Sequence, residues 1–134
     1  MGRALVRALR ATSVEVAVLD LPASLDQHPV PAGVKAFAMD ASDEESVAAA
    51  FRVLSLEWGA ADGYCNLVGF MNAWAPLAKL AVGDFDAAIA GNLRSHYLCA
   101  RAAMPLLHKG EEPAMVSVSS TLGIDVGKGY VHYS

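Results

Sequence analysis

Hydrophobic and polar positions follow two patterns along the chain, one typical of helices and one typical of buried strands. Leu5, Val6 and Leu9 are spaced to share one face of a helix over residues 3–11. The stretch 21–33 contains three prolines and a glycine, which predicts a loop. Short apolar or β-branched runs predict four strands, over residues 14–19, 34–39, 62–68 and 114–119.

Two longer segments carry helix signals. Ser42 is positioned to accept hydrogen bonds from first-turn amides and Glu45 to reach back, so a helix is predicted from about residue 43 to 57. A second helix is predicted from about Asp84 to His108. Strands separated by such helices predict a doubly wound, parallel α/β sheet of Rossmann-like type. No interdomain linker is visible, so residues 1–134 are assigned to a single domain.

Composition narrows the classes of partner. Apolar residues make up 54% of the 134 positions, which is ample for a core. The net charge is −4 without a basic block, which argues against nucleic acid and acidic membranes as partners. No apolar run is long enough to span a bilayer, and we expect a cytoplasmic protein. Cys65 and Cys99 lie in apolar segments without metal-ligand spacing and are interpreted as reduced structural thiols.

Polar residues fall at the carboxyl ends of the predicted strands, where doubly wound sheets bind ligands. Asp20 lies eighteen residues after Gly2, close to the spacing at which an acidic side chain binds the ribose hydroxyls of a dinucleotide. A lone Asp that opens a loop is more often merely solvated. The strand-end residues are Asp20, Asp40, Asn66 with Gly69, and Ser119 with Ser120.

A serine and a tyrosine thirteen positions apart, Ser120 and Tyr133, follow the fourth strand. Such a pair can hold a substrate oxygen and exchange a proton with it. Free Tyr has a pKa of about 10, so the tyrosine needs a nearby cation, and no Lys or Arg follows it. Adjacent strand side chains face opposite ways, so we expect Ser119 to be a buried hydroxyl. Tyr130 is the rival tyrosine, and His132 is a weaker candidate for a general base.

Gly91 and Asn92 interrupt the long predicted helix, where a glycine costs about 1 kcal/mol relative to alanine. Two interpretations stay open: an exposed position where propensity matters little, or a local kink that frees a carbonyl for a water. An apolar stripe on the same helix predicts either core packing or a subunit contact. Its members are Leu93, Tyr97, Ala100, Met104 and Leu107.

Taken together, these residues resemble the short-chain dehydrogenase/reductase family. The segment Gly2–Val6 resembles the end of that family's glycine-rich loop, TGxxxGIG, and residues 66–69 resemble its NNAG motif, with Leu67 and Val68 in place of Asn and Ala. The resemblance implies that Asn92, Ser120 and Tyr133 are catalytic. It implies that the cofactor is bound by Gly2, Asp20, Asp40, Ala41, Asn66, Gly69 and Tyr133.

The implied activity is hydride transfer between a nicotinamide cofactor and a secondary alcohol or ketone. Ser120 would hydrogen-bond the substrate oxygen, Tyr133 would exchange its proton, and Asn92 would fix a relay water. Asp20 favours NAD over NADP, because a carboxylate bonds a 2′-hydroxyl and repels a 2′-phosphate. The resemblance also implies a small alcohol or carbonyl substrate, no metal, and a homo-oligomer.

Three parts of the family pattern have no counterpart here: the first strand, most of the glycine loop, and the lysine four residues after the tyrosine. We therefore expect a fragment of a longer enzyme that by itself is unstable and a poor catalyst. In the family's strand order the first strand is central, between the strand that ends at Asp20 and the strand that contains Asn66. A non-catalytic dinucleotide-binding or interaction module, or a methyltransferase of similar topology, stays open as an alternative, although a methyltransferase has no use for Ser120 with Tyr133.

Overall fold

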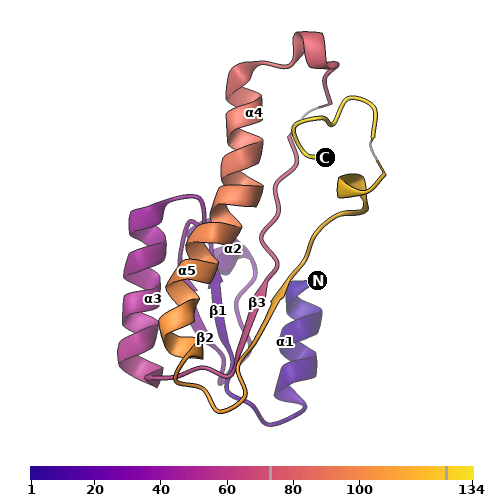
Figure 1. The fold of residues 1–134 in the computed structure, drawn as a ribbon. Helices are drawn as coiled ribbons and strands as arrows, with labels where there is room; N and C mark the ends of the chain where they lie inside the picture. Colours follow the sequence, from indigo (N-terminus) through magenta and orange to yellow (C-terminus); the bar gives the residue numbers. More distant parts are fainter. Residues whose placement is uncertain (73, 126) are drawn as a thin grey trace.

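The computed structural model describes residues 1–72, 74–125 and 127–134, which form a parallel α/β fold (Figure 1). All four predicted strands are present over shorter ranges: β1 (Ala17–Asp20), β2 (Lys35–Ala38), β3 (Gly63–Asn66) and β4 (Ala114–Ser117). The α-helices are α1 (Gly2–Arg10), α2 (Pro22–Gln27), α3 (Glu44–Trp58), α4 (Val82–Ile89) and α5 (Ser95–Leu107). Three short helices complete the order: η1 (Leu77–Lys79), the π-helical η2 (Ala90–Arg94) and η3 (Thr121–Gly123).

The strands form two separate parallel pairs, β1 with β2 and β3 with β4. In the first pair Ala17 lies opposite Lys35, and in the second Gly63 lies opposite Ala114. Among the described residues, no strand pairs with the other edge of β1 or of β3. This arrangement confirms the prediction that these two strands are not neighbours.

The free edges of β1 and β3 can be assigned residue by residue, because backbone groups point to alternate sides along a strand. The carbonyls of Val16 and Asp20 accept hydrogen bonds from the amides of Lys35 and Met39 on the β2 side, at 3.0 and 2.8 Å. The backbone groups of Ala17 and Leu19 therefore face away from β2. By the same alternation, the bonds from Ala114 to Asp62 and from Val118 to Asn66 turn the backbone groups of Gly63 and Cys65 away from β4.

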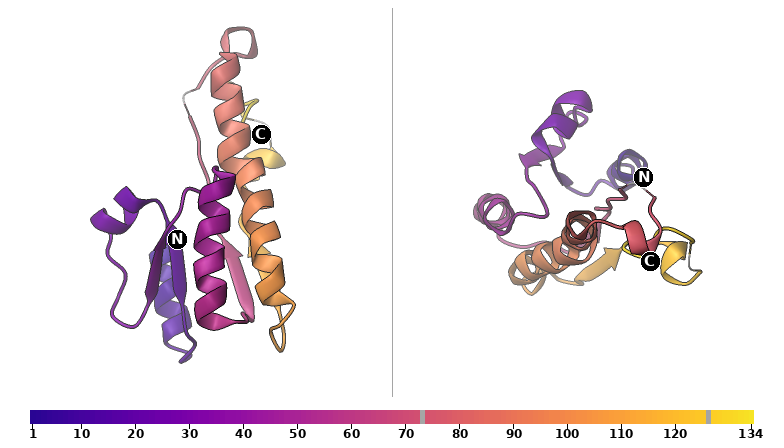
Figure 2. Two further views of the ribbon diagram at one scale, coloured as in Figure 1. Left: turned by 90° about the vertical axis from the view of Figure 1, so that its left-hand side faces the viewer. Right: turned by 90° about the horizontal axis from the view of Figure 1, so that it is seen from above.

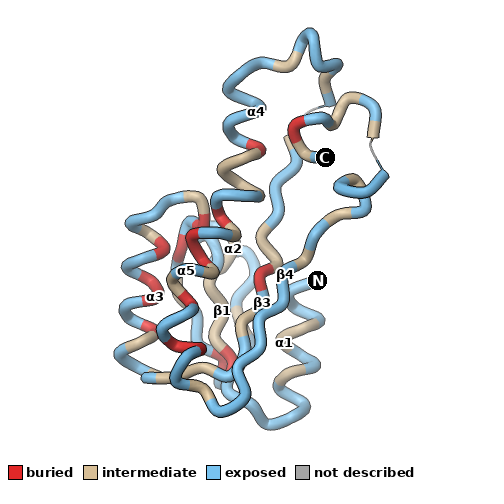
Figure 3. The backbone as a smooth tube through the Cα atoms, viewed as in Figure 1, coloured by how far each residue is buried: buried red, intermediate tan, exposed pale blue. Residues whose placement is uncertain are grey.

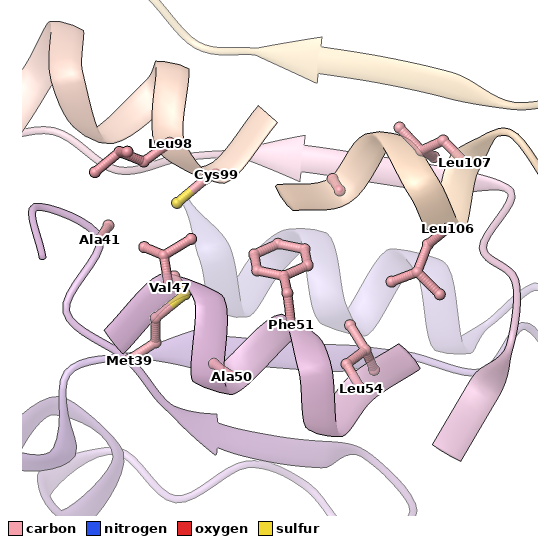
Figure 4. Close-up of a cluster of buried hydrophobic side chains, with 11 residues drawn as sticks. Met39, Ala41, Val47, Ala50, Phe51, Leu54, Leu98, Cys99, Leu106 and Leu107 are labelled. Atoms are coloured by element: carbon pink, nitrogen blue, oxygen red, sulfur yellow. The ribbon is translucent and has the colours of Figure 1, made fainter. Parts of the chain in front are cut away.

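Hydrophobic burial is concentrated between α3 and α5 and on the strands beneath them. Figure 2 shows α3 and α5 together on one side of the strands and α1 on the opposite side. Phe51 and Leu54 of α3 are 5% exposed, and Leu106 of α5 is 3% exposed. Figure 3 shows buried positions along α3 and α5 and none along α1. The cluster in Figure 4 contains Met39, Ala41, Val47, Ala50, Phe51, Leu54, Leu98, Cys99, Ala103, Leu106 and Leu107.

A cavity of about 1590 Å³ lies among α1, β1 and β3. Leu5, Val6 and Leu9, the predicted apolar face of α1, line this cavity and are only half-buried. Residues from both free strand edges, including Leu19 and Cys65, line it as well. The apolar face of α1 is therefore directed at the space between the two strand pairs.

Two local predictions were wrong for identifiable reasons. The stretch 21–33 is not all loop, because Pro22 occupies the first turn of α2, where its fixed φ favours a helix, and Asp20 accepts from the Leu21 amide and the Ser24 hydroxyl. The N-cap of α3 is Asp43 and not Ser42: the Asp43 carboxylate accepts from the Glu45 amide at 3.1 Å.

The long predicted helix contains a π-helical turn, η2, at Gly91 and Asn92, so of the two interpretations the structure favours a local distortion of the helix. The Ser95 hydroxyl donates to the carbonyls of Gly91 and Asn92, at 2.9 and 3.1 Å, within this widened turn. A Cβ on Gly91 would lie 2.8 Å from the Cβ of Phe70. Glycine is thus needed for the close approach of η2 to the segment after β3.

The apolar stripe on the long helix divides into two parts. Leu107 is buried in the core, whereas Leu93 and Tyr97 are 68% and 59% exposed. The Arg101 guanidinium lies 5.5 Å from the centre of the Tyr97 ring and also pairs with Glu44, which lowers the pKa of the Glu44 carboxyl. Core packing is therefore wrong for the outer part of the stripe, and a subunit contact there stays a prediction. Within the described residues, no helix combines the length and apolar character that crossing a membrane requires.

Gly91→Ala should lower the free energy of unfolding by about 1–3 kcal/mol, because the new methyl group overlaps Phe70. The matched control is Gly83→Ala in α4, where nothing lies within 4 Å of an added Cβ and stability should rise by up to about 1 kcal/mol. Urea unfolding followed by circular dichroism measures both changes. Equal effects at the two positions would contradict the close packing of η2 on Phe70.

The 134-residue chain by itself should associate through the free edges of β1 and β3, since unpaired strand edges readily take up further strands. Size-exclusion chromatography with light scattering should show a mass that rises with concentration. Val18→Asp, which places a charge beside the β1 edge, should reduce this association. A chain that is monomeric at all concentrations and unfolds cooperatively would contradict the expectation.

Candidate active site

The carboxyl ends of the strands lie at one edge of the fold (Figure 1), and the residues predicted to bind a cofactor gather there. Six of the seven line the cavity between β1 and β3. Asn92, Ser120 and the seventh, Tyr133, are outside its lining. The six are Gly2, Asp20, Asp40, Ala41, Asn66 and Gly69.

Asn66 places an unsatisfied donor at this edge. The residue is 2% exposed, and its Oδ1 accepts from the Val68 amide at 3.0 Å, which shapes the turn after β3. Its Nδ2 is buried and has no hydrogen-bond partner among the described residues. The start of α1 is close by, since a Cβ on Gly2 would lie 3.9 Å from Leu67. A buried amide donor in a cavity lining suits a ligand with acceptor oxygens.

The two strand-end carboxylates are oriented by local hydrogen bonds. Asp20 accepts from the Leu21 amide at 2.8 Å and from the Ser24 hydroxyl at 3.0 Å. Asp40 accepts from the amide and the hydroxyl of Ser42, at 2.9 and 2.7 Å. A carboxylate has about four acceptor positions, so each can accept further hydrogen bonds from a ligand. The local bonds fix the direction in which those positions face.

The Asn92 side chain joins η2 to the segment after β3. Its Oδ1 accepts from the Phe70 amide at 2.9 Å, and its Nδ2 donates to the carbonyls of Phe70 and Ala88 at 2.7 and 2.8 Å. The side chain therefore uses both of its N–H donors and one lone pair of its oxygen inside the protein. The Asn92 backbone carbonyl accepts from the Ser95 hydroxyl at 3.1 Å and also from the Ser95 amide in the widened turn.

His96 is a contributor that sequence reasoning missed. Its Nε2 lies 2.9 Å from the Val68 carbonyl, so the turn after β3 is held by both Asn92 and His96. The signal was present, because residues four apart in a helix share a face and His96 follows Asn92 by four positions. Nothing in the sequence indicated which carbonyl the side chain would reach.

Ser120 lies beyond the end of β4 and begins η3, where its Oγ accepts from the Leu122 amide at 3.2 Å. Ser119 is exposed, so its predicted burial was wrong: β4 ends at Ser117, and the alternation of a paired strand does not extend to Ser119. Tyr133 is half-buried in a turn in which its amide donates to the Tyr130 carbonyl at 2.8 Å. Figure 1 shows this turn and η3 on the same side, beyond the carboxyl ends of β3 and β4.

Two titratable groups of the core, Tyr64 and Cys99, are poor candidates for the acid/base role. Burial raises the pKa of the Tyr64 phenol and of the Cys99 thiol, which keeps both neutral. His132 is 5% exposed, with its ring 6.5 Å from that of Tyr130. Cys65 is exposed, contrary to a purely structural thiol. In the part of the chain that the structure describes, no three His, Cys, Asp or Glu side chains group in a way that could hold a metal ion.

Comparison with known proteins places these features in a family. Residues 1–134 match the protein family described as "Enoyl-(Acyl carrier protein) reductase". The short chain dehydrogenases mpl6 of Monascus purpureus and citE of Monascus ruber are each 37% identical over 108 residues. The match covers 81% of this chain and 36% of each relative, so the chain spans about a third of their length.

Solved structures agree in fold. A 3-ketoacyl-ACP reductase from Sinorhizobium meliloti 1021 is 33% identical, with a TM-score of 0.85 over 98% of this chain and 55% of that protein. The aldohexose dehydrogenase of Thermoplasma acidophilum is 21% identical and has a TM-score of 0.85, over 98% of this chain and 49% of that protein, and supports the fold alone. With a Rossmann-like fold and a match over its whole length, the chain belongs to the short-chain dehydrogenase/reductase family.

Proposed function

We propose that the protein transfers a hydride between a nicotinamide cofactor and a secondary alcohol or ketone, with residues 1–134 as part of one dinucleotide-binding domain. The observation that carries the proposal is the set of residues at the carboxyl ends of the strands, Asp20, Asp40 and Asn66 with its unpaired amide, which line the cavity between β1 and β3 together with the start of α1. The nicotinamide cofactor supplies the carbon that accepts or donates the hydride. Family membership supports a cofactor of this class.

The adenosine side of the cofactor is assigned to the β1–β2 pair. Asp20 is exposed at the end of β1 with its carboxylate oriented by Leu21 and Ser24, and it accepts from the ribose hydroxyls. Asp40 and Ala41 lie beside the adenine. A negative charge at Asp20 favours NAD, because it repels a 2′-phosphate.

Proton transfer is assigned to Ser120 and Tyr133. The Ser120 hydroxyl hydrogen-bonds the substrate oxygen, and the Tyr133 phenol exchanges a proton with that oxygen. Asn92 fixes a relay water, while its side chain holds the Phe70 segment. The substrate is a small alcohol or carbonyl compound, and the exposed Leu93 and Tyr97 belong to the contact of a homo-oligomer.

A further parallel strand between β1 and β3 completes the catalytic form in this proposal. Support comes from the free edges of both strands and from the apolar face of α1, all of which line the same cavity. Without a strand there, Asp20 and Asn66 belong to two strand pairs that share no backbone hydrogen bonds, and we expect negligible turnover. Equilibrium titration with NADH and with S-adenosylmethionine discriminates against a methyltransferase, which would bind only the second.

Tyr133→Phe in the catalytic form should lower kcat by about 10²–10⁴-fold, because it removes the group that exchanges the proton, and should leave NADH binding largely intact. Steady-state kinetics and fluorescence titration with NADH give the two quantities. Tyr130→Phe is the matched control and should retain most activity. The reverse outcome, loss in Tyr130→Phe and activity in Tyr133→Phe, would transfer the role to Tyr130.

Asp20→Ala should lower the NAD/NADP ratio of kcat/KM by about tenfold or more, since like charges about 4 Å apart repel by about 1–4 kcal/mol. Asp20→Asn keeps an oxygen for the Leu21 amide and separates the charge effect from the loss of that hydrogen bond. Asp40→Asn is the control and should leave the ratio unchanged. A constant ratio in both Asp20 variants would remove Asp20 from the cofactor site.

A further inference from the structure

Two hydrogen bonds join the segment after β3 to the turn that carries Tyr133. The indole Nε1 of Trp74 donates to the Lys128 carbonyl at 2.8 Å. The Ala75 amide donates to the Gly129 carbonyl at 3.1 Å. These segments are far apart in the sequence, and neither belongs to the main core cluster, so the contact is a separate tertiary link.

Gly129 is required at this contact for two independent reasons. Its φ of 79° lies in the left-handed region that side chains disfavour. A Cβ at this position would also lie 1.9 Å from the Trp74 Nε1, which leaves no room for any other residue. Trp74 is 57% exposed, so its burial does not explain the contact. The hydrogen bond to Lys128 and the close approach to Gly129 show that the Nε1 edge of the indole contacts the backbone of residues 128–129.

The link is one step in a series of contacts that ends at Tyr133. Asn92 binds both backbone groups of Phe70, and the Asn72 side chain donates to the Asp84 carbonyl at 2.7 Å, which fixes the segment before Trp74 on α4. After Gly129, the turn closes through the bond from the Tyr133 amide to the Tyr130 carbonyl. A shift at residues 128–129 is therefore passed to Tyr133 through only four residues of tight turn.

We propose that Trp74 and Gly129 form a clamp that holds the turn carrying Tyr133 against residues 74–75, so that Trp74 is a positioning residue for the proton-transferring tyrosine. The catalytic part of this inference rests on the proposed function. The existence of the clamp does not, because it is defined by contacts within residues 74–129.

Limited trypsin digestion tests the clamp on the 134-residue chain. The chain has two Lys-Gly bonds, Lys128–Gly129 at the clamp and Lys109–Gly110 in the turn after α5, and the second serves as an internal control. Trp74→Phe keeps an aromatic ring and removes the donor, so cleavage after Lys128 relative to Lys109 should rise roughly fivefold, as expected for one lost hydrogen bond. Trp58→Phe is the matched control, because the Trp58 Nε1 has no partner among the described residues, and its ratio should stay unchanged.

Gly129→Ala supplies a second measurement that does not involve the protease. In a Trp58→Phe background Trp74 is the sole tryptophan, so its fluorescence reports on the clamp alone. The added methyl should displace the indole and raise acrylamide quenching about twofold, as more of the ring becomes exposed. An unchanged cleavage ratio in Trp74→Phe together with unchanged quenching in Gly129→Ala would overturn the clamp.

Kinetics of the catalytic form test the role of the clamp. Trp74→Phe should lower kcat about ten- to a hundredfold through misplacement of Tyr133, with the KM for NADH unchanged. A loosened clamp with an unchanged kcat would overturn the positioning role. If the catalytic form without substitutions shows no dehydrogenase activity, the proposed function and the role of the clamp in it both fail, while the cleavage ratio still decides whether the clamp exists.

Discussion

The absence of backbone pairing between β1 and β3 is the constraint on which the rest of the structure depends. Each buried amide or carbonyl without a partner costs about 1–3 kcal/mol, against a stability of about 5–15 kcal/mol for a whole domain. The free backbone groups belong to Ala17, Leu19, Gly63 and Cys65, and they face a cavity of about 1590 Å³. Water that enters this cavity can hydrogen-bond to them. The same cavity explains why the apolar face of α1 is only half-buried.

The packing of α3 against α5 keeps the two strand pairs in one fold. Phe51 of α3 lies edge-on to Tyr64 of β3 at 6.2 Å, and it shares the core with Leu106 of α5. At the surface, Arg101 of α5 pairs with Glu44 of α3, and Arg94 donates to the Ser42 carbonyl. The candidate cofactor residues belong to both strand pairs, β1–β2 and β3–β4. The geometry of the site therefore depends on the contacts between α3 and α5 and on what fills the cavity between β1 and β3.

The sequence predicted the architecture well because its signals were local. Each strand was visible as a short apolar run, and Gly91 next to Asn92 marked the position at which the long helix widens into η2. The errors arose where two local interactions competed. Asp43 and Ser42 could both cap α3, and the choice was settled by the Ser42 hydroxyl binding Asp40 instead.

The candidate site was predictable as a set of residues and not as a set of contacts. The strand-end pattern predicted Asp20, Asp40 and Asn66 as a set, and all three line the cavity between β1 and β3. Two contacts join segments far apart in the chain: the hydrogen bonds between Asn92 and Phe70, and the close approach of Trp74 to Gly129. Such contacts follow from tertiary packing, and no spacing in the sequence encodes them.

Native-state hydrogen exchange of the 134-residue chain, at a concentration where it is monomeric, tests the unpaired edges most directly. The amides of Val18 and Tyr64 point toward β2 and β4 and should be protected. The amides of Ala17, Leu19 and Cys65 point into the cavity and should exchange near the rate of an unstructured peptide. Equal protection along both edges of β1 and β3 would contradict an open space between the two strand pairs.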